Sequence, residues 1–236
     1  MASTNAENFL EAYRRLENLM RERQREDKYT SFSALVDKSG DSVVQRYNRE
    51  LKRYADLRNA IVHHEHEDDQ PIADPRTDAV ENFQEAVEKI TDPPGLGPFR
   101  RNVYTAAPSD DIGVVMEKME HENFSQMPIQ DEEEVIAVLT TNTITRWIGA
   151  ELHQDGEGLL VTETSVGDVL HHTEREDNYS FLSRDATLYE AHEAFQVGKS
   201  LREPPDAVLI THNGRSSESL LGIITPFDLP DLVSRL

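Results

Sequence analysis

The sequence lacks cysteine and long apolar runs, and each absence excludes a class of protein. With no Cys among 236 residues, neither a disulfide-stapled fold nor a cysteine-ligated zinc site can form. No apolar run approaches the ~20 residues that a membrane helix needs. The first 15 residues also lack the apolar core of a signal peptide. We therefore expect a cytoplasmic protein that has no membrane partner.

Charge is strongly negative and unevenly divided along the chain. The net charge is −21 at pH 7, with +1 on residues 1–65 and −22 on residues 66–236. A field of that sign repels polyanions from the C-terminal part, so we expect no DNA partner. Only the N-terminal part can approach RNA without a large repulsive penalty.

The first ~90 residues have the apolar periodicity of helices. Apolar side chains recur every three or four positions, which is typical of buried helical stripes. This pattern predicts helices over 8–25, 43–62 and 78–90, and a short one from Phe32 that Thr30 or Ser31 caps. The string Asp92-Pro-Pro-Gly-Leu-Gly-Pro98 ends the pattern, because adjacent prolines and glycines cannot continue a helix. We place an all-α helical bundle at residues 1–92 and a linker at 93–98.

Beyond the linker, short β runs alternate with helices, and this pattern occurs twice. In each copy a helix precedes two β runs and a second helix follows them. The second β run ends at Thr140 in the first copy and at Thr225 in the second, 85 residues apart. Such self-similarity indicates an internal repeat whose copies cover each other's small sheet. We place the copies at residues 99–160 and 161–236, which makes the fold class α+β, a helical bundle followed by two β-α-β-β-α repeats.

The clearest binding motif is Gly222-Ile-Ile-Thr225-Pro-Phe-Asp228. A buried strand is expected to end there in a hydroxyl, and the helix that follows presents a carboxylate. Thr225 with free backbone N–H groups suits a phosphate, and Asp228 can accept hydrogen bonds from two adjacent ribose hydroxyls. The structural alternative is an ordinary helix cap, with Thr225 as the cap and Pro226 at the first helical position.

Both copies resemble the CBS domain, the regulatory module first recognised in cystathionine beta-synthase. The resemblance rests on Phe124–Ile129 and Val135–Thr140 in the first copy, and on Asp185–Leu188, Pro205–Ile210 and Gly222–Asp228 in the second. It implies a tandem pair with two clefts between the repeats. Such pairs bind AMP, ADP, ATP or S-adenosylmethionine as a regulatory ligand, without chemistry and without a required cofactor.

The resemblance also implies which residues bind the ligand. Thr225 would contact the phosphate and Asp228 the ribose. The remaining candidates are the backbone around Asp206, Ala207 and Val208 for the base, Asp185 and Thr187 as cleft lining, and Gln126 and Pro128 from the first copy.

The first copy departs from the family pattern at two positions. Ala137 stands in place of the usual glycine, and Thr143 stands where the ribose-binding aspartate belongs. Because Thr cannot chelate a diol as a carboxylate does, we expect one competent site per chain, built around Asp228. The surrounding acidity favours a monophosphate, a dinucleotide or S-adenosylmethionine over a triphosphate held without a cation.

A second motif, Arg58-Asn-Ala-Ile-Val-His63, lies near the end of the predicted helix 43–62. It resembles the Arg-x4-His motif of HEPN domains, helical bundles that include many dimeric ribonucleases. The resemblance implies a homodimer in which His63 is the general acid/base and Arg58 stabilises charge on the phosphate, without a metal. The alternative is that both residues face solvent and pair with Asp56 or Glu65.

The string from His63 to Asp69 is rich in His, Asp and Glu, but it lacks the pattern of a closed metal site. We expect a solvated acidic loop there and no bound metal.

These observations favour a nucleotide-sensing regulator whose CBS pair signals to a HEPN-like bundle. A ligand-gated, metal-independent ribonuclease is the first alternative, and a non-catalytic dimeric interaction module is the second. The sequence therefore leaves open whether the protein is an enzyme.

Overall fold

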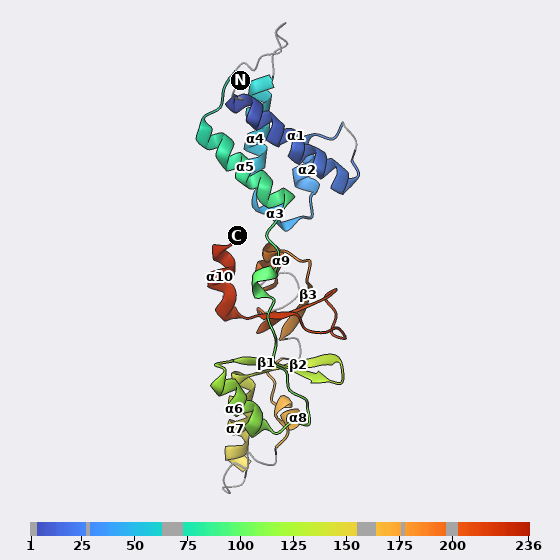
Figure 1. The fold of residues 1–236 in the computed structure, drawn as a ribbon, viewed down its shortest axis with the longest axis vertical. Helices are drawn as coiled ribbons and strands as arrows, with labels where there is room; N and C mark the ends of the chain where they lie inside the picture. The colour runs from blue at the N-terminus through green and yellow to red at the C-terminus, as the bar shows by residue number, and fades with distance from the viewer. Residues whose placement is uncertain (1–3, 27–28, 63–72, 155–163, 176–177, 197–202) are drawn as a thin grey trace. The chain divides into compact units, whose positions relative to one another are not determined.

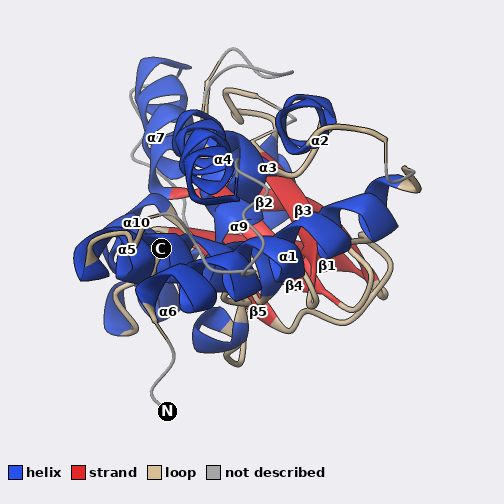
Figure 2. Ribbon diagram, turned by 90° about the horizontal axis from the view of Figure 1, so that it is seen from above, coloured by secondary structure: helices blue, strands red, loops and turns tan. Residues whose placement is uncertain are grey.

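A computed structural model describes residues 4–26, 29–62, 73–154, 164–175, 178–196 and 203–236. The chain divides into two compact units, Met1–Pro94 and Gly95–Leu236. Among the described residues, the first unit is entirely helical and every strand lies in the second (Figures 1 and 2). The α+β fold class expected from the sequence is therefore confirmed.

The first unit contains the expected helices, with one correction. Its elements are α1 (Asn5–Gln24), α2 (Phe32–Lys38), α3 (Ser42–Arg46), α4 (Asn48–Val62) and α5 (Thr77–Thr91). The single helix predicted over 43–62 is wrong, because the backbone at Tyr47 leaves the helical region (φ −94°, ψ 5°). The Gln45 side chain donates to the carbonyls of Val36 and Ser39, at 2.8 and 2.7 Å, and so ties α3 to the end of α2.

Aromatic side chains form the centre of this helical core. Phe9, Tyr13 and Phe32 pack with Tyr54 and Phe83, and the closest ring centroids are 4.6 Å apart. Offset aromatic contacts of this kind add to the free energy of area burial. The core therefore joins α1, α2, α4 and α5.

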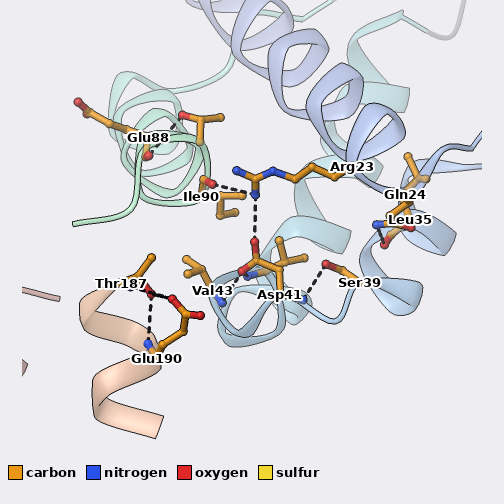
Figure 3. Close-up of polar contacts among 12 residues, drawn as sticks. Arg23, Gln24, Leu35, Ser39, Asp41, Val43, Glu88, Ile90, Thr187 and Glu190 are labelled. Atoms are coloured by element: carbon orange, nitrogen blue, oxygen red, sulfur yellow. Dashed lines mark hydrogen bonds and ion pairs between the residues drawn. The ribbon is translucent and has the colours of Figure 1, made fainter. Parts of the chain in front are cut away.

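A polar junction holds the far end of α1 (Figure 3). Arg23 pairs with the Asp41 carboxylate at 3.0 Å and also donates to the carbonyl of Ile90 at 3.4 Å. Asp41 itself caps α3 by accepting from the amide of Val43 at 2.8 Å. One arginine thus links α1 to the start of α3 and the end of α5.

The second unit is built from the two expected copies. Its elements are η1 (Gly97–Phe99), α6 (Ile112–His121), β1 (Gln126–Asp131), β2 (Glu134–Thr140), α7 (Thr141–Gln154), α8 (Val166–Leu170), β3 (Tyr179–Ser183), α9 (Leu188–Ala194), β4 (Ala207–Thr211), β5 (Gly222–Ile224), η3 (Pro226–Asp228) and α10 (Leu229–Ser234). β1 pairs with β2 in antiparallel register, while β4 lies between parallel β3 and antiparallel β5. In the first copy, a parallel bridge from Ala106 to Ile129 takes the place that β3 has in the second.

The segment that precedes each repeat is buried in the core of the other repeat. Leu96 and Phe99, placed by the sequence in the linker and at the start of the first repeat, are buried in the core of the second repeat. Conversely, Val166 and Val169 of α8 are buried in the core of the first repeat, which also contains Trp147. The core of each repeat thus contains residues that the sequence pattern places outside that repeat.

A third apolar cluster joins the sheets of the two repeats. Val135 and Val138 of β2 pack there with Ala207, Leu209 and Ile223 from the second repeat. The repeats therefore share one buried interface within the second unit.

None of the described helices has both the length and the apolar character to cross a membrane.

Candidate ligand cleft

A cleft of about 390 Å³ is lined by residues of both repeats and of the chain that leads into them. Small-molecule sites usually measure ~300–1,000 Å³. The lining residues are Arg101, Asn102, Val103, Tyr104, Glu122, Asn123, Phe124, Ser125, Gln126, Pro128, Ile223, Thr225, Phe227 and Asp228. The structure therefore brings four of the predicted ligand residues together, namely Gln126, Pro128, Thr225 and Asp228.

Thr225 and Asp228 are joined by hydrogen bonds at one end of this cleft. The Asp228 Oδ2 atom accepts from the Thr225 amide at 2.8 Å and from the Thr225 hydroxyl at 2.9 Å. This is the cap that the sequence offered as a structural alternative, with Pro226 at the first position of η3. The cap and the cleft lining use the same two side chains, so the two interpretations are compatible.

Arg101 completes this end of the cleft, and the sequence analysis missed it. Its Nη2 atom donates to the carbonyl of Ile223 at 3.0 Å and to both oxygens of Asp228 at 3.2 Å. The Arg101 side chain is 50% exposed and that of Asp228 is 18% exposed. The amide of Arg101 donates to the carbonyl of Leu221, and this pairing beside β5 brings the two charges together.

Aromatic side chains line the rest of the cleft. Tyr104 and Phe124 have ring centroids 5.6 Å apart, and Phe227 is 79% exposed although it is a large apolar residue. Exposed aromatic faces in a concave site are surfaces on which a flat heterocycle can stack.

The carboxylate of Glu122 is already compensated by a lysine. Lys118 lies 2.9 Å from Glu122 and 4.1 Å from the centroid of the Tyr104 ring. The hydrogen bond between them lowers the pKa of Glu122 and raises the pKa of Lys118. Arg101 and Asp228 therefore remain as the charged pair that a ligand would meet.

Three of the predicted base-contacting residues lie away from the cleft lining. The side chains of Ala207 and Val208 are fully buried in two different cores. Asp206 pairs with Asn178, whose side-chain amide donates both to Asp206 at 3.1 Å and to the carbonyl of Val138 at 3.2 Å. The Asp206 carboxylate thus positions a bridge between the repeats.

Asp185 and Thr187 also lie outside the cleft lining. Thr187 caps α9, because its hydroxyl accepts from the amide of Glu190 at 3.1 Å while the Glu190 carboxylate accepts from Thr187 (Figure 3). Asp185 is exposed and lies 3.6 Å from the Arg184 guanidinium.

The equivalent strand end of the first repeat is closed. Thr140 and Thr143 are 6% and 2% exposed, their hydroxyls are 3.1 Å apart, and the amide of Thr143 donates to the Thr140 hydroxyl at 3.0 Å. Both hydroxyls of this small motif therefore have a partner inside the protein.

The second predicted motif is described only in part. His63 lies outside the described residues, as does the acidic string that follows it. Arg58 is half-buried, with its guanidinium carbon 6.0 Å from the centroid of the Tyr13 ring. Burial is the main reason that the pKa of Tyr13 is raised, and Glu17 adds to it. In the part of the chain that the structure describes, no group of His, Asp and Glu is placed to hold a metal ion.

Comparison with known proteins identifies part of this region. A family model described as the CBS domain matches residues 97–150. The curated proteins yield no match.

Solved CBS-domain structures resemble part of this chain at low identity. A protein of Kribbella flavida is 14% identical, covers 60% of this chain and 99% of its own, and gives a TM-score of 0.44. One from Agrobacterium tumefaciens is 19% identical, covers 57% and 89%, and gives 0.39. CBSX2, solved in complex with AMP, is 14% identical, covers 60% and 96%, and gives 0.41.

Residues 97–150 span η1, α6 and the β1–β2 hairpin and run into α7, and they contribute ten of the residues that line the cleft. This part of the chain therefore matches the CBS domain.

Proposed function

We propose that the protein is a regulator whose cleft binds an adenine nucleotide or a related adenosyl ligand. The observation that carries this proposal is the convergence of Thr225 and Asp228 with aromatic side chains and with Gln126 in one cleft. A carboxylate suits a ribose diol, an exposed aromatic ring suits a base, and side-chain amides can pair with the edge of a base.

The position of the cleft supports a regulatory role. Both repeats and residues 101–104 line it, and residues 101–104 lie only a few positions after the boundary between the two units. A ligand that prefers one arrangement of this lining shifts the population toward that arrangement. We propose that the helical unit is HEPN-like and that it receives this signal.

The direct test measures unfolding of the second unit with and without ligand. Trp147 is the only tryptophan of the chain and is buried in that unit, so its fluorescence reports the relevant transition. A ligand at 100 times its Kd adds about 2.7 kcal/mol to native stability. That corresponds to a rise in melting temperature of roughly 5–10 °C for a unit of this size. AMP, ADP, ATP and S-adenosylmethionine are the probes.

Asp228→Ala should weaken binding ~10–100-fold, because charge-assisted hydrogen bonds are lost. At the same ligand concentration the stabilisation should then fall from about 2.7 to about 0.4–1.4 kcal/mol. Asp231→Ala is the matched control, since Asp231 pairs with Arg235 on the exposed side of α10 and does not line the cleft. The absence of a shift with all four probes in the unmodified protein would refute the proposal.

The ribonuclease alternative and the homodimer stay predictions. The expected result for the former is metal-independent cleavage of RNA that His63→Ala abolishes without changing the melting curve. Undiminished cleavage by that variant would exclude the motif as a catalytic centre and favour the non-catalytic interaction module.

A further inference from the structure

We infer that Arg101 makes the cleft selective for nucleoside phosphates over nucleosides and over sulfonium-bearing adenosyl ligands. This inference rests on the proposed function and names the ligand class of the same cleft. It starts from the hydrogen bonds of two side chains, Arg101 and Asp228.

The Asp228 carboxylate is partly occupied when no ligand is present. Its Oδ2 atom accepts from the Thr225 amide, the Thr225 hydroxyl and Arg101, whereas Oδ1 accepts from Arg101. A carboxylate offers about four acceptor positions. A ribose diol, which needs two of them, therefore competes directly with the Arg101 guanidinium.

The Arg101 guanidinium has donor capacity to spare. All of its hydrogen bonds to the described residues leave from Nη2, so Nε and Nη1 are available to a ligand. Half of the side chain is exposed, and it lines the cleft. A guanidinium presents a planar fork of donors that matches a phosphate.

These two facts couple phosphate and ribose binding. A phosphate that draws Arg101 away from Asp228 gives the guanidinium a new anionic partner and frees Oδ1 for the diol. A nucleoside without phosphate must break the Arg101–Asp228 pair and leaves the guanidinium without an anion. A sulfonium ligand adds a positive charge beside that guanidinium, where like charges repel.

Glu122 does not compensate for a lost partner of Arg101. It is held by Lys118 at 2.9 Å, and Lys118 also lies against Tyr104. Ligand selection at this end of the cleft therefore depends on one arginine.

The experiment compares the affinities of AMP, adenosine and S-adenosylmethionine by calorimetry on the full chain. We expect AMP to bind at least ~10-fold more tightly than adenosine, and Arg101→Gln to reduce this ratio to about 1 mainly through weaker AMP binding. Arg101→Lys keeps the charge without the planar fork and should give an intermediate ratio. Arg100→Gln is the matched control, because Arg100 is exposed and does not line the cleft.

Each outcome decides between the two proposals. Equal binding of AMP and adenosine to the unmodified protein would overturn the role of Arg101 and leave the proposed function standing. A ratio that survives Arg101→Gln would do the same. Failure of all three probes to bind would overturn both. Because Arg101→Gln also removes an ion pair, Trp147 fluorescence must first show that the variant is folded at the temperature of the titration.

Discussion

Each repeat ends its central hairpin with a side-chain hydrogen bond between residues three positions apart, but the two pairs lie in different surroundings. In the first repeat, Thr140 and Thr143 satisfy each other and are almost completely buried. In the second, the Thr225 hydroxyl donates to the Asp228 carboxylate, and both residues line the cleft. Two hydroxyls can be buried once they are hydrogen-bonded, whereas a carboxylate needs water or a cation. The difference between Thr143 and Asp228 therefore accounts for why the first position lies in the core and the second lines the cleft.

The strands that carry these motifs differ in a second way. A Cβ placed at Gly222 would lie 2.4 Å from the carbonyl oxygen of Phe99, because residues 99–101 run directly against β5. The first repeat has Ala137 at the matching position, paired with Ile129. The glycine is thus required by the segment that brings Arg101 to the cleft.

The largest expected loss of stability comes from adding a side chain at Gly222, where the backbone of Phe99 lies against β5. Gly222→Ala should destabilise the second unit by about 2–3 kcal/mol, because the backbone at Phe99 must move. The melting temperature followed by Trp147 should then fall by roughly 5–10 °C. Ala137→Gly, the reverse change in the first repeat, should cost only ~1 kcal/mol. Equal losses of stability in the two variants would contradict the requirement for glycine at position 222.

A smaller loss of stability should follow when a carboxylate is introduced at position 143, in the closed strand end of the first repeat. Thr143→Asp places a charge at a position that is 2% exposed, with an expected cost of about 2 kcal/mol. Desolvation raises the pKa of the introduced carboxyl in the folded state. The penalty is therefore complete at neutral pH, and it shrinks as the pH falls through the raised pKa toward the unfolded value of ~4.

Melting curves of Thr143→Asp between pH 7 and pH 4 test this sign. Thr143→Asn, which has a similar shape and no charge, is the control and should show no such pH dependence. A charged variant as stable as the unmodified protein at pH 7 would show that the first repeat can open as the second does.

Features that depend on a local pattern of residues could be predicted from the sequence. The periodicity of Val80, Phe83, Val87 and Ile90 predicted a buried face of α5, and all four are buried. The repeat and the Thr225–Asp228 motif were also visible, since each lies within a short stretch. Periodicity did not predict α8 or β3, which have five residues each.

Long-range pairing is what the sequence could not supply. Arg101 and Asp228 are 127 positions apart in the sequence. They are brought together by a backbone pairing beside β5 that no local pattern predicts. The sequence predicts a buried strand over Ala207–Thr211, and the structure confirms it. Its side chains therefore pack into two apolar cores instead of lining the cleft. The carboxylate of Asp206 is directed to Asn178, a partner that only the fold brings near.

A modest effect is expected from neutralising the cleft carboxylate. Asp228→Asn removes the ion pair with Arg101 and should cost ~0.5–1 kcal/mol after allowance for solvent screening. The loss should shrink in 1 M NaCl, where the screening length falls to about 3 Å. Asp231→Asn, which breaks the exposed pair with Arg235, should change stability less. A loss that is independent of salt would assign the role of Asp228 to the cap alone.

The smallest expected effect concerns the loops of the two hairpins. Glu132, with φ 54°, lies in the tight turn of the first, whereas Glu218 stabilises the longer loop of the second by accepting from the side chain and amide of Asn213, both at 2.6 Å. These bonds lower the pKa of Glu218 from 4.5 to about 2. Its contribution is thus present above pH 4.5 and is lost as the pH falls toward 2.

Glu218→Gln should therefore lower the melting temperature slightly at pH 7 and leave it unchanged near pH 2. Ser216 of the same loop accepts from the amide of Val135 and donates to the Glu134 carboxylate, so the loop also contacts the hairpin of the first repeat. Glu132→Gln is the matched control in the short turn, and its effect should not depend on pH in this way. A constant difference between Glu218→Gln and the unmodified protein from pH 7 to pH 2 would contradict the role assigned to the carboxylate, because a charge that anchors the loop must lose its effect when it is protonated.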